Sequence, residues 1–428
     1  MLLQNLTKRE IKIKDTSWDF RDSYTKESNH GFHTYPAMMI PQIARRLIET
    51  YGKNSEVILD PFMGSGTAIL EAMLNKNFKK AYGIDINPLA LLISKVKTTA
   101  INSEILKEEY EKLIKKCNND KIGVNFKRKE IKKPNFFNIE FWFKPQVIND
   151  LAIIKSNINK IEDKDVKDFF LVIFSEIVRR VSNTRNKEYK LYRMNDKMLK
   201  KHNPDTFKEF EIKSLKNISN MEDFFKNYNK ECKVNILAED TRNLTSIPSN
   251  SIDLIVTSPP YGDSKTTVAY GQFSRLGLQW LDYNQKEVLN IDKISLGGIP
   301  SKELENDLVS PTLKITLNQI SEIDSKRAKD VLSFYVDFNK CVKELHRVTK
   351  KGAFICFVVG NRTVKGIQIP TDDIIVELFK EKNHYTHHNT FIRNIPHKRM
   401  PTLNSPSNIS GNHAVTMNEE WIIILEKQ

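Results

Sequence analysis

The feature that most constrains the fold is an apolar strand that ends at two consecutive prolines. Residues 252–256, Ile-Asp-Leu-Ile-Val, have the composition of a buried strand, and Thr257-Ser-Pro-Pro-Tyr261 follows at once. Proline has no N–H to donate to a central ladder, and the residue before a proline is held extended. The chain therefore leaves the sheet rigidly at the carboxyl end of a strand, which is where open α/β sheets bind ligands.

Four residues at this exit form the predicted catalytic group, Ser258, Pro259, Pro260 and Tyr261. Tyr261 offers a stacking surface for a planar base. Ser258 and carbonyl groups held by the prolines offer acceptors for an exocyclic amino group. The alternative interpretation is a plain Pro-Pro turn whose tyrosine packs on the rim of the sheet, and this segment alone leaves both open.

A second segment predicts the beginning of the same sheet. Val57–Asp60 is a short apolar strand that runs into Pro61-Phe-Met-Gly-Ser-Gly-Thr67, and a helix is expected from there to about Asn75. Residues 81–85 form another strand, and Asn87-Pro88 opens another helix. This β-loop-α-β order is typical of a doubly wound α/β nucleotide-binding fold.

The loop between the first strand and helix is suited to a ligand. Gly64 and Gly66 let the backbone turn sharply and approach a bound group, and the helix N-terminus adds free N–H groups. Asp85 ends the next strand, where a carboxylate bonds a ribose hydroxyl pair, and Asp240 is placed to accept from an adenine amino group. No lysine follows Gly66-Thr67, so this is not a P-loop. An adenosine-type cofactor without a polyphosphate fits these features.

Between about residues 100 and 232 the pattern changes to Lys, Asn, Ile and Phe without strand alternation. Residues 166–181 have clear helical spacing, which predicts a mostly helical inserted subdomain. The sheet resumes near 234, and a polar stretch at about 283–328 is expected to be a second insertion or a long loop. A helix over 331–348, a strand over 353–359 and a final antiparallel pair, 390–395 with 421–425, complete the prediction. We therefore divide the chain into 1–99, 100–232 and 233–428.

Composition indicates the class of binding partner and the cellular compartment. The net charge is +14 and the pI about 9.3, which favours a polyanion, nucleic acid first and an anionic membrane surface second. The four cysteines are scattered without a C-x-x-C pair, and the late histidines have no carboxylate at ligand spacing, so no metal site is predicted. The N-terminus lacks the apolar core of a signal peptide, and a cytoplasmic protein is expected.

Together these segments resemble the signature motifs of S-adenosylmethionine-dependent DNA amino-methyltransferases, the N4-cytosine and N6-adenine enzymes of restriction–modification systems. His33-Thr-Tyr-Pro-Ala is similar to their N-terminal cofactor motif. Asp60–Thr67 matches the D-P-F-x-G-S-G-T loop, and Thr257–Tyr261 matches the catalytic S/D/N-P-P-Y. The segment 389–401 resembles the one between their last strands. The resemblance covers roughly two-thirds of the chain and leaves the two inserts outside it.

The resemblance implies a seven-stranded, Rossmann-like methyltransferase sheet and S-adenosyl-L-methionine as the cofactor. The residues it assigns to cofactor binding, together with those chosen above, are His33, Tyr35, Pro36, Asp60, Pro61, Phe62, Gly64, Ser65, Gly66, Thr67, Asp85, Asn87, Asp240 and Thr241. The implied reaction is direct methyl transfer to the exocyclic amine of a flipped base, without a covalent intermediate. Serine before Pro-Pro-Tyr favours cytosine N4 in this family, whereas Asp or Asn favours adenine N6.

Double-stranded DNA is the implied partner, with room for a cognate restriction endonuclease, and target recognition is expected in the inserts. The predicted DNA-binding residues are Arg179, Arg180, Arg185, Lys187, Lys190, Arg193, Arg393, Lys398 and Arg399. A solvated basic face is the alternative for each of them. Three other functions remain open, an N6-adenine DNA methyltransferase, an RNA amino-methyltransferase and an inactive DNA-binding specificity subunit. The last would be expected to have lost one of Asp60, Gly64, Ser258 or Tyr261.

Overall fold

The computed structural model describes residues 12–125, 130–185, 188–263, 267–380, 384–396, 403–404, 414–415 and 417–428. Lys187, Lys398 and Arg399 lie outside these ranges. Within the described part of the chain, no helix combines the length and the apolar composition that crossing a membrane requires.

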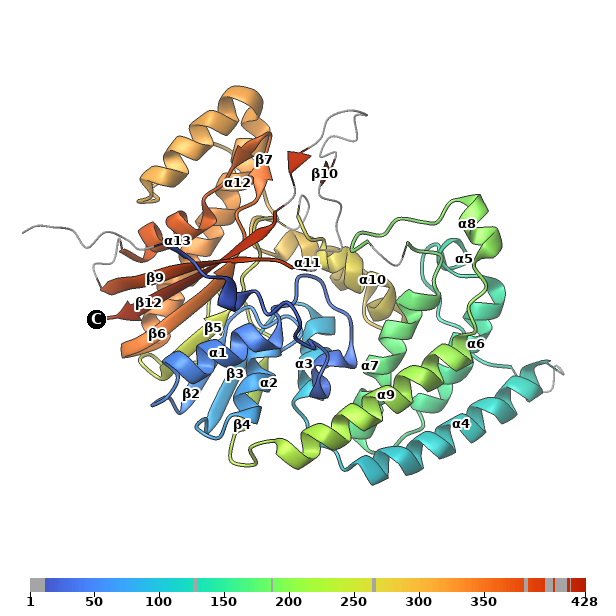
Figure 1. Ribbon diagram of the computed structural model, residues 1–428. Coiled ribbons are helices and arrows are strands. Elements are labelled where there is room, and N and C mark those ends of the chain that lie inside the picture. Colours follow the sequence, from blue (N-terminus) through green and yellow to red (C-terminus); the bar gives the residue numbers. More distant parts are fainter. Residues whose placement is uncertain are drawn as a thin grey trace, which may run out of the picture.

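The protein is built on one eight-stranded sheet, drawn at the left of Figure 1, in the order β1-β9-β12-β6-β5-β2-β3-β4. Its strands are β1 (Lys12–Lys14), β2 (Val57–Asp60), β3 (Lys80–Ile84), β4 (Lys233–Leu237), β5 (Ile252–Thr257), β6 (Thr349–Val359), β9 (Tyr385–Asn394) and β12 (Glu419–Lys427). All neighbours are parallel except those of β12, which is antiparallel to both β6 and β9. The predicted doubly wound α/β sheet is confirmed. It has seven strands in the expected arrangement, and β1 adds an eighth beside β9.

Both faces of the sheet are buried because its central strands alternate between two apolar clusters. On β12, Ile422 and Ile424 face one cluster, and Ile423 and Leu425 face the other. The first face carries α1 (Pro41–Tyr51), α2 (Thr67–Leu74) and α3 (Pro88–Lys97), and the second carries α12 (Pro311–Val348) and α13 (Thr371–Lys380). Covering both faces is what a mostly parallel sheet requires.

The polar stretch 283–328 is more helical than its composition indicated. It contains α11 (Gln285–Ile294) and the first part of α12, which begins at Pro311 rather than near residue 331. The Ser310 hydroxyl caps that start by accepting from the N–H of Leu313 at 3.1 Å. Asp324 has non-helical dihedrals and kinks α12, so two helices join there. The described residues also contain two short antiparallel pairs, β7 (Thr363–Val364) with β8 (Ile367–Gln368) and β10 (Leu403–Asn404) with β11 (Ala414–Val415).

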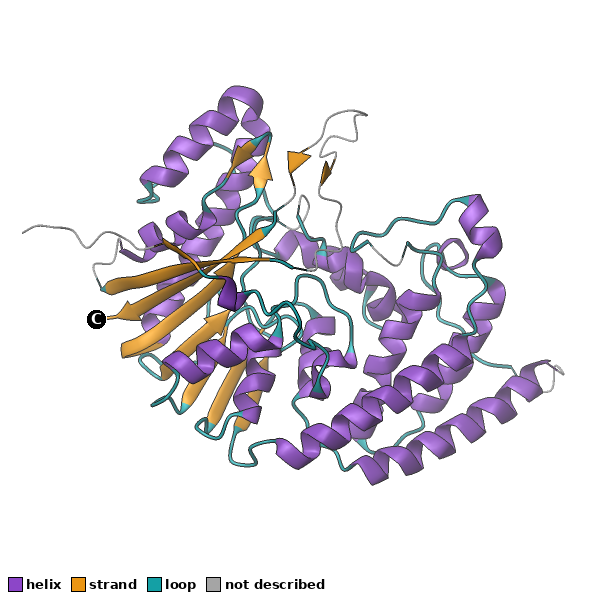
Figure 2. Ribbon diagram, viewed as in Figure 1, coloured by secondary structure: helices purple, strands orange, loops and turns teal. Residues whose placement is uncertain are grey.

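A block of helices lies beside the sheet, at the right of Figures 1 and 2. Its elements are α4 (Ser103–Asn125), α5 (Ile139–Trp142), α6 (Pro145–Ile158), α7 (Lys164–Val181), α8 (Asp196–Lys201) and α9 (Thr206–Asn227). The segment after β5, α10 (Tyr270–Trp280), packs against α7. The helix α7 begins where the Asp163 carboxylate accepts from the N–H of Asp165 and of Val166, both at 2.9 Å.

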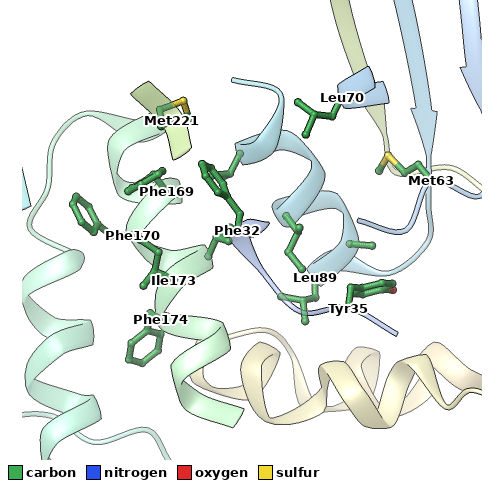
Figure 3. Close-up of a cluster of buried hydrophobic side chains, with 14 of the residues drawn as sticks. Phe32, Tyr35, Met63, Leu70, Leu89, Phe169, Phe170, Ile173, Phe174 and Met221 are labelled. Atoms are coloured by element: carbon green, nitrogen blue, oxygen red, sulfur yellow. The ribbon is translucent and has the colours of Figure 1, made fainter. Parts of the chain in front are cut away.

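The helical block is fastened to the sheet through the short segment before α1, which contains the 3-10 turns η1 (Thr16–Trp18) and η2 (Ser28–Phe32). Phe32 is fully buried, and its ring meets that of Phe169 of α7 edge-on at 5.6 Å (Figure 3). The same segment donates the N–H of Thr34 to the Glu176 carboxylate of α7 at 3.2 Å. On the other side, His30 Nε2 of η2 lies 2.8 Å from the Glu71 carboxylate of α2, so this segment joins α7 to a helix of the sheet.

Candidate active site

A cleft of about 910 Å³, a volume that includes space open to solvent, lies at the carboxyl ends of β2, β3, β4 and β5, the edge at which doubly wound sheets bind ligands. The predicted site residues that line it come from all four strand ends and from the segment before α1. They are Tyr35, Pro36, Asp60, Pro61, Phe62, Gly64, Ser65, Thr67, Asp85, Asn87, Asp240, Thr241, Ser258 and Pro260.

The floor of the cleft is the turn from β2 to α2, and it needs both glycines. Gly64 has φ +49° and Gly66 has φ +78°, a left-handed conformation that side chains with a Cβ adopt only at a cost. A Cβ on Gly66 would also lie 2.8 Å from the Ser94 hydroxyl, which donates to the Gly64 carbonyl at 2.8 Å. The turn is therefore fixed by conformation and by packing on α3.

Two carboxylates, those of Asp85 and Asp60, lie at the floor of the cleft, and both accept hydrogen bonds from backbone N–H groups. Asp85 accepts from the N–H of Gly64 at 3.0 Å and of Asn87 at 2.8 Å. Asp60 is buried and accepts from the Thr257 hydroxyl at 2.6 Å, which ties β2 to β5. Burial raises the pKa of Asp85 to about 6 and that of Asp60 to about 7, because desolvation disfavours the charged form.

One wall of the cleft is a pair of stacked aromatic rings, Tyr35 and Tyr270, beside the Asn87 amide. The Asn87 amide donates to the Tyr35 hydroxyl at 3.0 Å and to the Ser274 hydroxyl at 2.8 Å, while its side-chain oxygen caps α3. The Tyr35 ring stacks on that of Tyr270 at 5.9 Å between centroids. The segment before α1, the turn between β3 and α3, and the helix α10 therefore meet at this wall.

Ser258 stands at the opposite wall, where β5 ends. Its hydroxyl donates to the Val358 carbonyl of β6 at 2.9 Å and lies 3.4 Å from the Tyr261 hydroxyl. Tyr261 donates in turn to the Glu420 carboxylate of β12 at 3.3 Å. Pro259 is buried, and neither it nor Tyr261 lines the cleft itself. The four predicted catalytic residues thus lie together just after the end of β5, and of these Ser258 and Pro260 line the cleft.

His33 and Asp240 do not have the surroundings expected of them. His33 is turned into a separate hollow, where its Nε2 lies 3.0 Å from the Ser175 hydroxyl, and burial lowers its pKa to about 4. Both carboxylate oxygens of Asp240 already accept from the Arg242 guanidinium, so acceptance from an adenine amino group would compete with that pair. Thr241 donates its hydroxyl to the Pro61 carbonyl. Gly66 shapes the turn without lining the cleft.

Two of the predicted DNA-binding arginines are internal, which corrects their assignment. Arg179 is buried, donates to the Tyr189 carbonyl at 3.2 Å and covers the Phe273 ring at 4.4 Å. Arg393 is 2% exposed and pairs with Glu420 at 3.5 Å. The basic residues that keep access to solvent are Arg180, Arg185, Lys190 and Arg193.

Several cleft residues were not predicted from the sequence. Arg242 directly follows the predicted Thr241, and Tyr270 ends a stretch after Tyr261 that was expected to lie over the target base. Ile291, Ile294 and Leu296 lie in the stretch expected to be an insertion. The spacing of the apolar residues in 285–296 is the signal that indicates a packed helix there. Glu420 does not line the cleft but contacts Tyr261, and it carries no local signal because it lies at the start of an ordinary apolar strand.

The comparison with known families decides the identity. The sequence model of the DNA methylase family, which groups N6 and N4 methylases, matches residues 2–96 and 252–428. The chain belongs to the DNA methylase family. The match leaves out residues 97–251, which contain α4 to α9 and β4.

Known relatives of this DNA methylase agree with that assignment. Type II methyltransferase M.MvaI of Kocuria varians is 44% identical over 99% of this chain and 96% of its own. Type II methyltransferase M.BsoBI of Geobacillus stearothermophilus is 25% identical over 84% and 80%. A solved rRNA methylase from Streptococcus thermophilus aligns over 91% of this chain at 9% identity and a TM-score of 0.29, a level that supports no inference about RNA.

S-adenosylmethionine is the methyl donor of this DNA methylase, and the cleft fits it. The partly exposed Asp85, which lines the cleft, offers acceptors at the carboxyl end of β3. The ring of Phe62 lines the wall and stacks on Phe338 at 6.4 Å, which gives an adenine a flat apolar neighbour. The absence of a basic phosphate cradle on the β2–α2 turn agrees with a cofactor that has no phosphate.

Proposed function

We propose that this DNA methylase is a Type II methyltransferase of a restriction–modification system that methylates the exocyclic N4 of cytosine in duplex DNA, after flipping the base out of the helix. The observation that carries the proposal is the hydrogen bonding of Ser258. Its hydroxyl hydrogen is used by the Val358 carbonyl, so its lone pairs at the cleft wall accept a hydrogen bond from an amino group.

Serine at this position also supports cytosine over adenine. The family resemblance associates serine before Pro-Pro-Tyr with N4 of cytosine and Asp or Asn with N6 of adenine. N6 methylation of adenine is the second candidate, because a serine acceptor serves either amino group. The nearly full-length similarity to M.MvaI supports the Type II assignment and, with it, a cognate restriction endonuclease as a partner.

Bound S-adenosylmethionine supplies a methyl group on a positively charged sulfur. The protein's part is to place the amine and to favour its lone pair as nucleophile. Ser258 and the Pro259 carbonyl accept the amino hydrogens, and Tyr261 stacks on the base. Asp85 binds the ribose hydroxyls, with the remaining predicted cleft residues around the cofactor. No side chain needs to form a covalent bond.

We assign recognition of the DNA to the helical insert, 100–232. The loop after α7 presents Arg185, Lys190 and Arg193 together with two exposed tyrosines, Tyr189 at 40% and Tyr192 at 47%. Arg193 lies 4.5 Å from the ring centroid of the partly exposed Phe141, and Arg180 pairs with Glu209 at 3.1 Å on the same block. Cations interleaved with aromatic rings suit contact with phosphates and unstacked bases.

The proposal is tested by incubating the protein with methyl-labelled S-adenosylmethionine and either duplex DNA of varied sequence or structured RNA. Label is expected in DNA alone. Label in RNA alone would favour an RNA amino-methyltransferase, and no label in either would favour a DNA-binding subunit without activity. N6-methyladenine in the digested DNA would keep the enzyme and overturn the role given to Ser258.

A further inference from the structure

We propose that Glu420 is a positioning residue that holds the ring of Tyr261 in place for the target base, and that Arg393 holds Glu420. This inference rests on the proposed function, in which Tyr261 is the stacking surface. It assigns a role in the reaction to β9 and β12, which come last along the chain among the strands of the eight-stranded sheet.

The three side chains form one connected line. The Tyr261 hydroxyl donates to Glu420 Oε1 at 3.3 Å, and Glu420 Oε2 lies 3.5 Å from Arg393 Nε. Glu420 and Arg393 are direct cross-strand partners of β12 and β9, so the backbone register sets their separation. The Glu420 side chain is 19% exposed and that of Arg393 is 3% exposed. Because both are largely shielded from water, the hydrogen bond and the ion pair are weakened little by solvent. Arg393 Nε also donates to the Asn394 carbonyl at 3.3 Å.

Tyr261 reaches Glu420 by passing the end of β6, and a glycine makes room for it. Gly360 follows directly after β6, and a Cβ there would collide first with the Met417 side chain and would also lie 3.1 Å from Cδ2 of the Tyr261 ring. The ring is thus confined near Gly360 at its edge and by Glu420 at its hydroxyl. Burial raises the pKa of the Tyr261 phenol well above its ordinary value, so the hydroxyl keeps its hydrogen and donates it.

A structural ion pair alone does not explain this arrangement. Shielding two charges from water costs desolvation energy that apolar residues at the same strand positions would avoid. Glu420 also divides its oxygens, with one toward the arginine and one toward the tyrosine of the Ser-Pro-Pro-Tyr segment. A neighbouring carboxylate, Glu419, instead pairs with Lys14 at 2.7 Å, away from the site. A carboxylate that is held by Arg393 through one oxygen and accepts from Tyr261 with the other can fix the orientation of the tyrosine ring.

The test is a double-mutant cycle on kcat with duplex DNA, using Tyr261→Phe, Glu420→Ala and the double variant. Each single variant is expected to lower kcat about tenfold, the effect of losing one hydrogen bond to a charged group. The double variant should be no slower than the slower single variant. Glu420→Gln keeps an acceptor oxygen and should recover most of the rate. Glu419→Ala is the matched control and should leave kcat unchanged.

Thermal unfolding and cofactor binding of each variant are measured in parallel. Cofactor binding should be unchanged throughout, because Glu420 does not line the cleft. Effects on kcat that multiply in the double variant, or a Glu420→Ala protein with the wild-type rate, would overturn the inference. If Tyr261→Ala kept the wild-type rate, the stacking role of Tyr261 itself would be wrong. If Tyr261→Ala were inactive but the effects of Tyr261→Phe and Glu420→Ala on kcat multiplied in the double variant, only the role of Glu420 would be wrong. Should Glu420→Ala not fold, Glu420→Leu against Glu420→Gln gives the same comparison.

Discussion

Replacing Asp85 by alanine should weaken S-adenosylmethionine binding far more than it slows the chemical step. The carboxylate is expected to accept from the ribose hydroxyls, and hydrogen bonds to a charged group contribute roughly 1.5–3 kcal/mol each. Loss of one to two such bonds corresponds to roughly 100-fold weaker binding, since about 1.4 kcal/mol is a factor of ten. Asp85→Asn keeps one acceptor oxygen and should lose about tenfold.

The substitution also has a structural cost that must be separated from the effect on binding. Asp85 accepts from the N–H of Gly64 and of Asn87, and alanine leaves both without that acceptor. An unsatisfied buried donor costs roughly 1–3 kcal/mol. Asp253 is a matched control, because it also accepts from two backbone N–H groups, those of Glu56 at 3.1 Å and Val57 at 2.9 Å, but does not line the cleft.

Isothermal titration with S-adenosylmethionine and thermal unfolding without it measure the two effects. Asp85→Ala and Asp253→Ala should both lower the melting temperature, and only Asp85→Ala should lower the affinity. The turnover of Asp85→Ala should return toward that of the wild type at saturating cofactor. Equal affinities for the two variants would refute the assignment of Asp85 to the cofactor.

Three further predictions follow from the electrostatics of the site and of the insert. Because Asp85 and Asp60 have pKa values raised to about 6 and about 7, both are protonated at acid pH, and affinity for the cationic cofactor should rise between pH 5 and 8. Asp85→Asn should remove the lower inflection in a binding titration, and an unchanged profile would contradict this. DNA binding should weaken with salt, and Arg185→Ala and Arg193→Ala should each reduce the log–log slope by about 0.9. Arg179→Ala should leave that slope unchanged but cost about 2 kcal/mol of stability in denaturant unfolding, since its guanidinium is buried on Phe273.

The parts of the fold that were predicted are those with local causes. The strand before Ser258 ends where prolines remove donors, and the turn at Gly64 and Gly66 needs residues without a Cβ. The cleft residues of the motifs converge because parallel strands end at one edge. The pairing of Asp240 with Arg242 was not predicted, because Arg242 also reaches Asp337 of α12 at 3.0 Å, a contact that no spacing reveals.

The arginines show why the remainder was not predictable. Arg179 and Arg185 belong to one basic cluster in the sequence, yet one is buried and the other exposed. The difference comes from Phe273, about a hundred residues further along, which covers Arg179. Arg393 is likewise turned inward by its cross-strand neighbour Glu420. The charge pattern of a sequence can indicate a polyanionic partner, but it does not tell which basic side chains remain exposed and able to bind that partner.

The most direct test of the account is to identify the methylated nucleoside made by the wild-type protein and by Ser258→Ala. Duplex DNA of varied sequence is incubated with methyl-labelled S-adenosylmethionine, digested to nucleosides and analysed by mass spectrometry. We expect labelled N4-methylcytosine from the wild type, and from Ser258→Ala a loss of most of that product with cofactor binding retained. Labelled N6-methyladenine, or undiminished product from Ser258→Ala, would contradict the account.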